Sequence, residues 1–300
     1  RRIRRERPDF VLMKYWTPFM APCFGTIARL ARGNGHTKVL CQIDNVEPHE
    51  HHLTDKLFNR YYLHSVDGFV YMSEQVRSEL KTYTDAPALF SPHPLFENFG
   101  ERVARSEACV RLGLDPANRY VLFFGLIRDY KGLDLLLEAW ARLKRAGQTE
   151  GRRLIVAGEF YTAREPYLKQ IADNGLQDEV LLHDRFIPDD EVKYYFSAAD
   201  FVVQPYKTAT QSGVTQIAYQ FCVPMVVTKV GGLAEIVPDG RVGYVCKPTA
   251  EGVADAIERM YAGDTLLRFR ENCVGERRRF SWEEMCNRIA ELYEKVAAGR

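Results

Sequence analysis

Short apolar runs alternate with helical patterns along almost the whole of this 300-residue chain. Short apolar strands between helices are typical of parallel sheets that helices cover on both faces. The sequence therefore predicts an α/β fold. The expected strands are 9–14, 38–43, 68–72, 87–90, 120–125, 153–158, 179–183, 201–205, 224–229 and 243–246. The expected helices are 21–32, 55–64, 74–82, 132–146, 164–174, 188–198, 213–222, 250–262 and 281–297.

The alternation breaks near residues 92–107, which hold prolines, a glycine and a run of charges. Four expected strands precede the break and six follow it. We therefore expect a Rossmann-like unit over 1–100 and a second over 105–280. Residues 264–280 are expected to form a charged crossover, after which the last helix (281–300) packs back on the first unit. Two such units would face a cleft at the carboxyl ends of their strands, where open α/β sheets bind ligands.

The two ends of the chain add to this picture. The start, RRIRRERPDFVLMKYW, resembles the end of a basic helix followed at once by a strand. We therefore expect a first unit without its opening strands. Near the other end, Ser281 and Glu284 form a capping-box pattern at the start of the last helix.

Composition excludes several classes of function. The formal charge is +1, from 41 basic and 40 acidic residues, so binding to bulk nucleic acid is not expected. The seven cysteines are scattered, with no CxxC pair and no zinc spacing, which favours free thiols in a reducing cytoplasm. No apolar run approaches the ~20 residues that cross a bilayer.

The stretch 121–137, VLFFGLIRDYKGLDLLL, combines a strand, a basic loop and a helix. The strand ends at Gly125, the loop carries Arg128 and Lys131, and Gly132 opens the helix. Free N–H groups and the positive end of a helix dipole, with two cations beside them, make an anion site. An ordinary connection with solvated charges is the alternative.

Three more loops follow strands of the second unit: 158–160, 205–213 and 231–235. The second of these feeds a helix that starts near Gly213, with Ser212 or Thr210 as its cap, and so forms a second anion site. Two anion sites on adjacent loops suit a diphosphate, and cations would neutralise the charge that grows when it departs. The third loop, which contains Glu235, is equally typical of a glycine turn into a short capped helix.

Other phosphate-binding classes lack their motifs here. There is no Asp-x-Asp at a strand end for a metal, and no cofactor is expected besides a donor substrate. The P-loop pattern and a GxGxxG after a strand are both absent, which argues against a nucleotide hydrolase or a nicotinamide dehydrogenase.

These loops, in this order, resemble the carboxyl-terminal half of glycosyltransferase family 4. The stretches that carry the resemblance are FFGLIRDYKGLDLLLEAW, LIVAGEF, FIPDDEVKYYFSAADFVVQPY and PMVVTKVGGLAEIVPDGRVGYV, within 120–247. The first unit matches through IDNVEPHE, SVDGFVYMSEQV and SPHPLFENFG. The resemblance implies a GT-B fold, with an acceptor side in the first unit and a sugar-nucleotide site in the second.

The implied activity is a retaining, metal-independent glycosyltransferase. It would move a sugar from a nucleotide-diphosphate donor to a hydroxyl of a glycan or lipid-linked acceptor, in cell-surface polysaccharide synthesis. Two alternatives remain: a non-catalytic nucleotide-sugar-binding protein or inactive fragment, and a relative of another reaction type, such as a sugar-nucleotide epimerase.

Carried over by position, the resemblance assigns Lys131 to the donor diphosphate, the backbone at Gly213 and Val214 to the distal phosphate, and Phe186 with Ile187 to the nucleobase. The arginine that usually follows the strand's glycine is Leu126 here, and Arg128 is its substitute. The resulting predicted donor-binding residues are Gly125, Arg128, Lys131, Gly132, Glu159, Phe186, Ile187, Thr210, Gln211, Ser212, Gly213, Val214, Thr215, Gln216 and Glu235.

The family's Glu-x7-Glu pair is absent. Its first glutamate, beside the transferred sugar, falls where Thr210 or Gln211 stands. Its second, which holds the donor ribose, falls near Gln216, whose amide can still accept a hydrogen bond from a hydroxyl. The identity of the donor therefore stays open.

In the first unit, relatives place a histidine after a strand to contact the sugar. Asp44 falls closest to that position and His49 follows a few residues later, so both are catalytic candidates. Either is equally typical of a turn or a surface group. The His-rich run 49–52 is weak evidence for a metal. Residues 17–35 form either a core helix, which we favour, or an amphipathic helix on the inner face of a membrane.

Overall fold

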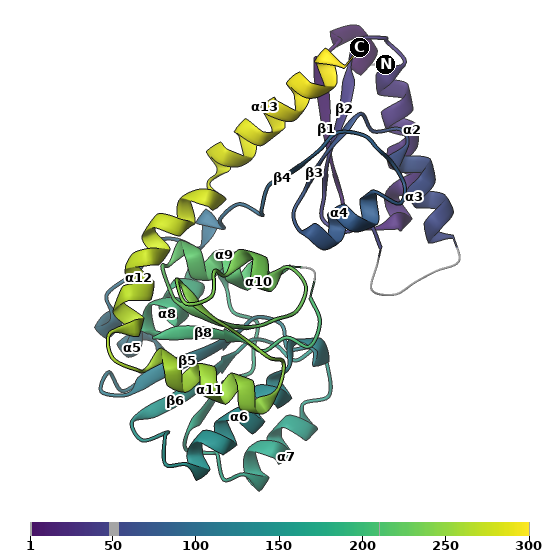
Figure 1. Ribbon diagram of the computed structural model, residues 1–300. Helices are drawn as coiled ribbons and strands as arrows, with labels where there is room; N and C mark the ends of the chain where they lie inside the picture. The colour runs from purple at the N-terminus through teal and green to yellow at the C-terminus, as the bar shows by residue number, and fades with distance from the viewer. Residues whose placement is uncertain (1, 48–53, 210, 300) are drawn as a thin grey trace. The chain divides into compact units, whose positions relative to one another are not determined.

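The computed structural model describes residues 2–47, 54–209 and 211–299 (Figure 1). The chain divides into two compact units. The first comprises the chain up to Pro94 and again from Phe280 onward, and the second is Leu95–Arg279.

The first unit holds a four-stranded parallel sheet in the order β1-β2-β3-β4. Its strands are β1 (Phe10–Tyr15), β2 (Lys38–Ile43), β3 (Gly68–Tyr71) and β4 (Ala88–Phe90). Its helices are α1 (Arg2–Glu6), α2 (Ala21–Arg32), α3 (Asp55–Leu63), α4 (Glu74–Leu80) and α13 (Trp282–Ala298).

Helix α13 covers one face of this sheet, although it comes last among the described elements (Figure 1). Its Met285, Leu292 and Val296 pack in one buried cluster with Leu40 and Val70 of the strands. Ser281 caps the helix, because its hydroxyl accepts a hydrogen bond from the Glu284 N–H at 3.1 Å. The predicted cap is therefore present.

The second unit holds a six-stranded parallel sheet in the order β10-β9-β8-β5-β6-β7. The strands are β5 (Arg119–Phe124), β6 (Arg152–Ala157), β7 (Val180–His183), β8 (Phe201–Gln204), β9 (Met225–Thr228) and β10 (Gly243–Cys246). The helices are α5 (Arg105–Leu112), α6 (Leu133–Arg145), α7 (Glu165–Asp173), α8 (Asp189–Ala198), α9 (Gly213–Gln220), α10 (Leu233–Ile236), α11 (Ala250–Met260) and α12 (Thr265–Glu276).

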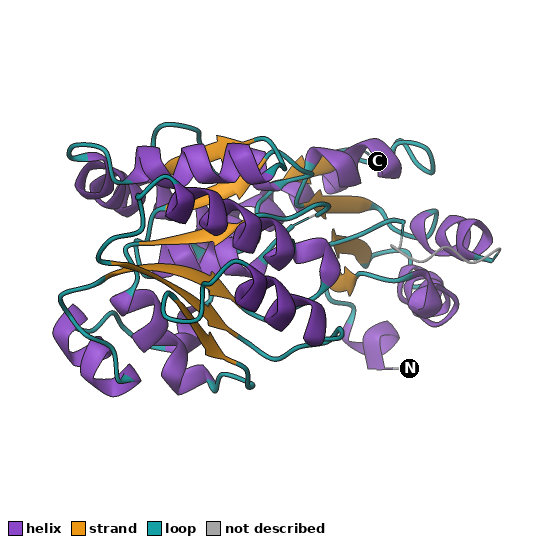
Figure 2. Cartoon of the chain, turned by 90° about the horizontal axis from the view of Figure 1, so that it is seen from below, coloured by secondary structure: helices purple, strands orange, loops and turns teal. Residues whose placement is uncertain are grey.

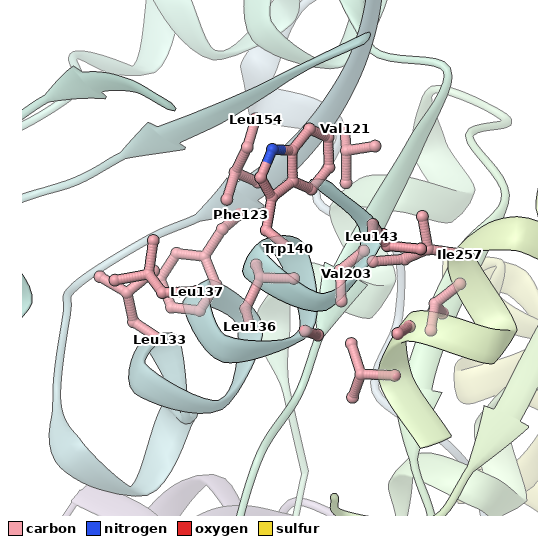
Figure 3. Packing of buried hydrophobic residues seen from close by; sticks show 14 of the residues in the cluster. Val121, Phe123, Leu133, Leu136, Leu137, Trp140, Leu143, Leu154, Val203 and Ile257 are labelled. Carbon is pink, nitrogen blue, oxygen red and sulfur yellow. The ribbon is translucent and has the colours of Figure 1, made fainter. Parts of the chain in front are cut away.

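Helices lie against both faces of this sheet (Figure 2). Successive strand residues point to opposite faces, so the apolar strand residues are covered by helices on each side. Phe123 packs in the cluster that α6 and α11 build, around the fully buried Trp140 (Figure 3). The ring of its neighbour Phe124 lies 5.1 Å from the ring of Phe196 on α8. The Trp140 indole N–H donates to Glu179 at 2.9 Å, so its one polar atom is satisfied.

All ten predicted strands are present, and two helices were missed. Residues 264–280 were expected as a charged crossover, yet they contain α12. The sequence of α12 has no clear apolar face, because Phe269 and Cys273 are its main buried apolar residues and charged residues surround them. Helix α5 lies inside the predicted break, and the residues it buries, Ala108 and Cys109, are too small to mark a periodic pattern.

Helix α2 packs on the sheet through small residues. It buries Ala21, Gly25, Ala28 and Ala31, as a core helix does. Its outward side carries the large residue Leu30, which is 57% exposed. None of the helices in the described ranges has both the length and the apolar character needed to span a bilayer.

Candidate functional site

The sheet order of the second unit places three predicted loops side by side. Strand β5 pairs with β8 on one side and with β6 on the other. All three run parallel, so their carboxyl ends lie at one edge. The loops that follow them, 125–132, 158–164 and 205–212, are neighbours at that edge. The sequence predicted this arrangement for the first and third.

Gly132 brings the first loop into contact with the loop after β8. Its φ is +70°, and a β-carbon there would lie only 2.1 Å from the carbonyl oxygen of Pro205. The Lys207 N–H also donates to the Tyr130 carbonyl at 2.7 Å. Any side chain at position 132 would therefore separate the two loops.

Gly158 likewise allows close contact between the loop after β6 and the loop after β5. A β-carbon at this residue would lie 2.2 Å from the Gly125 carbonyl oxygen. Beyond it, the Ile127 N–H donates to the Glu159 carbonyl at 2.8 Å and the Tyr161 N–H donates to the Ile127 carbonyl at 2.9 Å. The three loops are thus held together by backbone contacts.

Lys131 and the start of α9 meet beside Gly125. Because Gly125 lacks a side chain, other side chains approach its backbone closely. The Lys131 ammonium lies 3.3 Å, and the Val214 side chain 3.6 Å, from the point that a β-carbon of Gly125 would occupy. A cation and a helix N-terminus therefore converge on one small region, as a diphosphate site requires.

Burial, together with the smaller effect of the nearby Arg128 charge, lowers the pKa of Lys131 to about 8. Within the described ranges no carboxylate forms an ion pair with this ammonium; the aromatic ring of Tyr206 lies 5.9 Å away. A partly buried cation without a counter-charge is unfavourable. An anion bound beside Gly125 would remove that penalty.

This burial has a consequence for stability. Because the lysine pKa is lowered in the folded protein, the unfolded chain binds more protons than the folded chain between pH 8 and 10.5. The contribution of Lys131 to the free energy of unfolding therefore increases as the pH rises through that range. We expect Lys131→Met to be roughly 2–3 kcal/mol more stable than wild type at pH 7. The difference should shrink as the pH rises from 8 toward 10.5. Urea unfolding of both proteins across pH 6–10 measures it, and a difference that grows with pH would contradict the assignment.

The backbone N–H groups of the basic loop were expected to be free to bind an anion, and two of them are not. Residues Asp129–Lys131 form a short 3-10 turn, η3. The Lys131 N–H donates to Arg128 at 2.9 Å and the Gly132 N–H donates to Asp129 at 3.2 Å. These two groups are used inside the turn and do not face an anion. The Lys131 side chain is therefore the loop's main charged contribution.

Ser212 caps α9, as one of the two predicted caps. Its hydroxyl accepts a hydrogen bond from the Val214 N–H at 3.2 Å and lies 3.1 Å from the Tyr206 hydroxyl. Val214 thus has its N–H occupied by the cap, whereas Gly213 N–H makes no hydrogen bond within the described part of the chain. The other cap candidate, Thr210, lies outside the described residues.

Glutamine amides occur on the same loop and helix. Gln216 is 2% exposed, and its Oε1 has no hydrogen-bond partner among the described residues. The same holds for the Nε2 of Gln211 and for both amide atoms of Gln204 at the end of β8. Thr215 is satisfied, because its hydroxyl donates to the Ser212 carbonyl. Buried polar atoms in proteins usually have a hydrogen-bond partner, so these unpaired amide atoms are available to a ligand.

A pocket of about 160 Å³ opens beside Gly125. It brings together Glu159, Phe186 and Ile187, all three predicted as donor-binding residues. Phe186 is 65% exposed and Ile187 is buried. Sequence reasoning missed other lining residues, among them Phe99, Asp189 and Val192. They lie within stretches that carry the resemblance, but it assigned no role to these positions.

Two predicted residues lie at the margin of this arrangement. Arg128 is exposed, and its guanidinium lies 5.2 Å over the ring of Tyr161. Glu235 is exposed on α10, a four-residue helix in the loop after β9. The glycine turn into a short helix, one of the two interpretations of that loop, is what the structure contains.

The two catalytic candidates belong to the first unit. Asp44 follows β2, and its carboxylate lies 3.3 Å from the Lys14 ammonium. Burial raises the pKa of Asp44, while Lys14 opposes that rise. Its Oδ1 is buried without a partner in the described ranges. His49 and the His-rich run 49–52 lie outside the described residues. The residues that are described contain no group of three His, Cys, Asp or Glu side chains that could hold a metal.

Comparison with known proteins shows which family part of this chain resembles. Residues 118–263 match the family described as Glycosyl transferases group 1. A D-inositol 3-phosphate glycosyltransferase of Pseudarthrobacter chlorophenolicus is 32% identical over 151 residues, which cover 50% of this chain and 36% of that protein. The same enzyme of Segniliparus rotundus is 31% identical over 201 residues, 65% of this chain and 44% of that protein. The chain thus spans less than half the length of these two relatives.

Solved structures confirm the GT-B fold. A sucrose-phosphate synthase from Thermosynechococcus elongatus superimposes with a TM-score of 0.76 at 19% identity, covering 96% of this chain and 74% of that one. Anabaena HepE in complex with UDP gives a TM-score of 0.76 at 17% identity, covering 98% and 81%. At these identities the similarity shows architecture alone.

Proposed function

We propose that this chain is a group 1 glycosyl transferase, which moves a sugar from a nucleoside diphosphate donor to an acceptor hydroxyl. The match of residues 118–263 to that family supports the proposal. The observation that carries the proposal is the convergence of the Lys131 ammonium and the N-terminus of α9 beside Gly125. The first would neutralise one phosphate and the second the other.

The same groups would act most strongly as the sugar leaves. Negative charge grows on the diphosphate as the glycosidic bond breaks, and the sugar gains oxocarbenium character. Lys131, Arg128 and the helix dipole would stabilise that charge. The acceptor hydroxyl would attack on the face from which the diphosphate departs, which retains the configuration and places the hydroxyl proton beside a phosphate oxygen.

We propose uridine as the first nucleoside to test. The structural neighbour HepE is described in complex with UDP and, in another structure, with UDP and glucose. The test is calorimetric titration of the chain with UDP, GDP and ADP. Binding of one of them would support the donor site, and binding of none would overturn it.

A second function, binding without turnover, is favoured by one observation. Neutral residues, Thr210 or Gln211 and then Gln216, stand where the family pattern has glutamates, and Gln216 is buried without a partner for its Oε1 among the described residues. Consumption of a bound UDP-sugar that depends on an added acceptor would support transfer. Tight binding with no consumption would support the binding protein.

We propose that the first unit serves the acceptor, a glycan or a lipid-linked sugar of cell-surface polysaccharide synthesis. Asp44, with its unpartnered buried oxygen, is the described candidate to contact a hydroxyl there. Phe19 and Leu30, 82% and 57% exposed, support a peripheral contact with the inner face of the cytoplasmic membrane.

A further inference from the structure

Two phenylalanines lie on the short segment with which the second unit begins. This segment contains the 3-10 helix η2 (Glu97–Phe99). Phe99 lines the pocket beside Gly125, together with Phe186 from the loop after β7. The ring of Phe96 lies 6.0 Å from that of Phe99.

Phe96 reaches the other end of the proposed donor site. Its ring lies 3.3 Å from the point that a β-carbon of Gly213 would occupy, at the start of α9. One short segment therefore runs from the phosphate-binding helix terminus to the pocket. The Asn98 amide donates to the Asp189 carboxylate of α8 at 3.2 Å, which tethers the segment in place.

The pocket is apolar enough to take an aromatic ring. Phe99, Phe186 and Val192 supply apolar surface, and the exposed carboxylates Glu159 and Asp189 stand among its lining residues. Every nucleobase has a π-face that stacks on an aromatic side chain, whereas its polar edge stays free for hydrogen bonds. A largely exposed ring such as Phe186 gains most when a planar ligand covers it.

We propose that Phe99 is a nucleobase-stacking residue of the donor site, acting with Phe186. The inference rests on the proposed function and adds a binding residue to which the sequence analysis assigned no role. Phe96 packs over Gly213 and keeps the segment beside the phosphate region.

The test separates base from phosphate. UDP and inorganic pyrophosphate are titrated calorimetrically into wild type, Phe99→Ala, Phe99→Tyr and Phe99→Leu. Phe19→Ala, which removes a phenyl ring that is 82% exposed in the first unit, is the matched control. We expect Phe99→Ala to bind UDP about tenfold more weakly, the usual effect of losing one stacking partner. Its pyrophosphate affinity should not change.

The remaining variants make the outcome decisive. Phe99→Tyr keeps an aromatic face and should bind UDP like wild type, while Phe99→Leu, which replaces Phe99→Ala if that variant fails to fold, should bind weakly. UDP affinity of Phe99→Ala within twofold of wild type, or equal losses for UDP and pyrophosphate, would overturn the stacking role. Wild type that binds no nucleotide would instead overturn the proposed function itself.

Discussion

Replacing Gly132 with alanine is expected to lower the free energy of unfolding by roughly 3–4 kcal/mol. A left-handed backbone costs an alanine about 1–2 kcal/mol, and overpacking typically adds 1–3 kcal/mol. Here the added β-carbon would meet the Pro205 carbonyl oxygen at 2.1 Å, and this backbone atom moves only with its loop. Denaturant unfolding of the variant measures the loss.

Gly147→Ala is the matched control. Its φ is +72°, nearly the same as at Gly132, but nothing lies within 4 Å of the added carbon. It should cost only the backbone term, about 1–2 kcal/mol. The difference between the two variants therefore isolates the contact between the loops, and equal losses would show that the loops move apart without penalty. Gly132→Ala should also lose nucleotide affinity, because the loops would no longer hold Lys131 beside α9.

Lys131→Ala is expected to weaken nucleoside diphosphate binding by about 1.5–3 kcal/mol, which is roughly 10- to 150-fold. The variant removes the charged side chain nearest to Gly125 and leaves the glycine contacts intact. Calorimetric titration with the nucleotide that wild type binds gives the value.

Lys169→Ala is the control for this charge. Lys169 is exposed on α7 and paired with Asp173, so its loss should leave affinity unchanged. Because Lys131 is partly buried without a counter-charge in the described ranges, its removal should not destabilise the fold. Unaltered affinity in a folded Lys131→Ala variant would place the diphosphate elsewhere.

The central strands were predictable because they are buried on both faces. Runs such as VLFF in β5 or MVV in β9 carry no polar face, so they stand out against any helix. Helix α12 was not predictable in this way, since two buried side chains among charges give no clear period. The closeness of the first and third loops was predicted from two anion sites that suit one diphosphate, and the pairing of β5 with β8 accounts for it.

The details of the site were harder to predict. Lys131 could be named from a motif, but the internal use of the Lys131 and Gly132 N–H groups depends on a 3-10 turn that has no sequence signature. Phe99 is 26 positions before Gly125 and shares no element with it. Its presence in the pocket depends on tertiary packing of a segment that reads as an irregular connection.

Helix α13 gives the chain an order of assembly during synthesis. The second unit is continuous from Leu95 to Arg279, so all its strands are synthesised before α13. The first unit must wait, because Leu40 and Val70 stay uncovered until Met285, Leu292 and Val296 arrive. The unit that begins the chain is therefore the last to complete its core, and a nascent chain stopped before α13 would expose an apolar sheet face to chaperones and to other copies of itself.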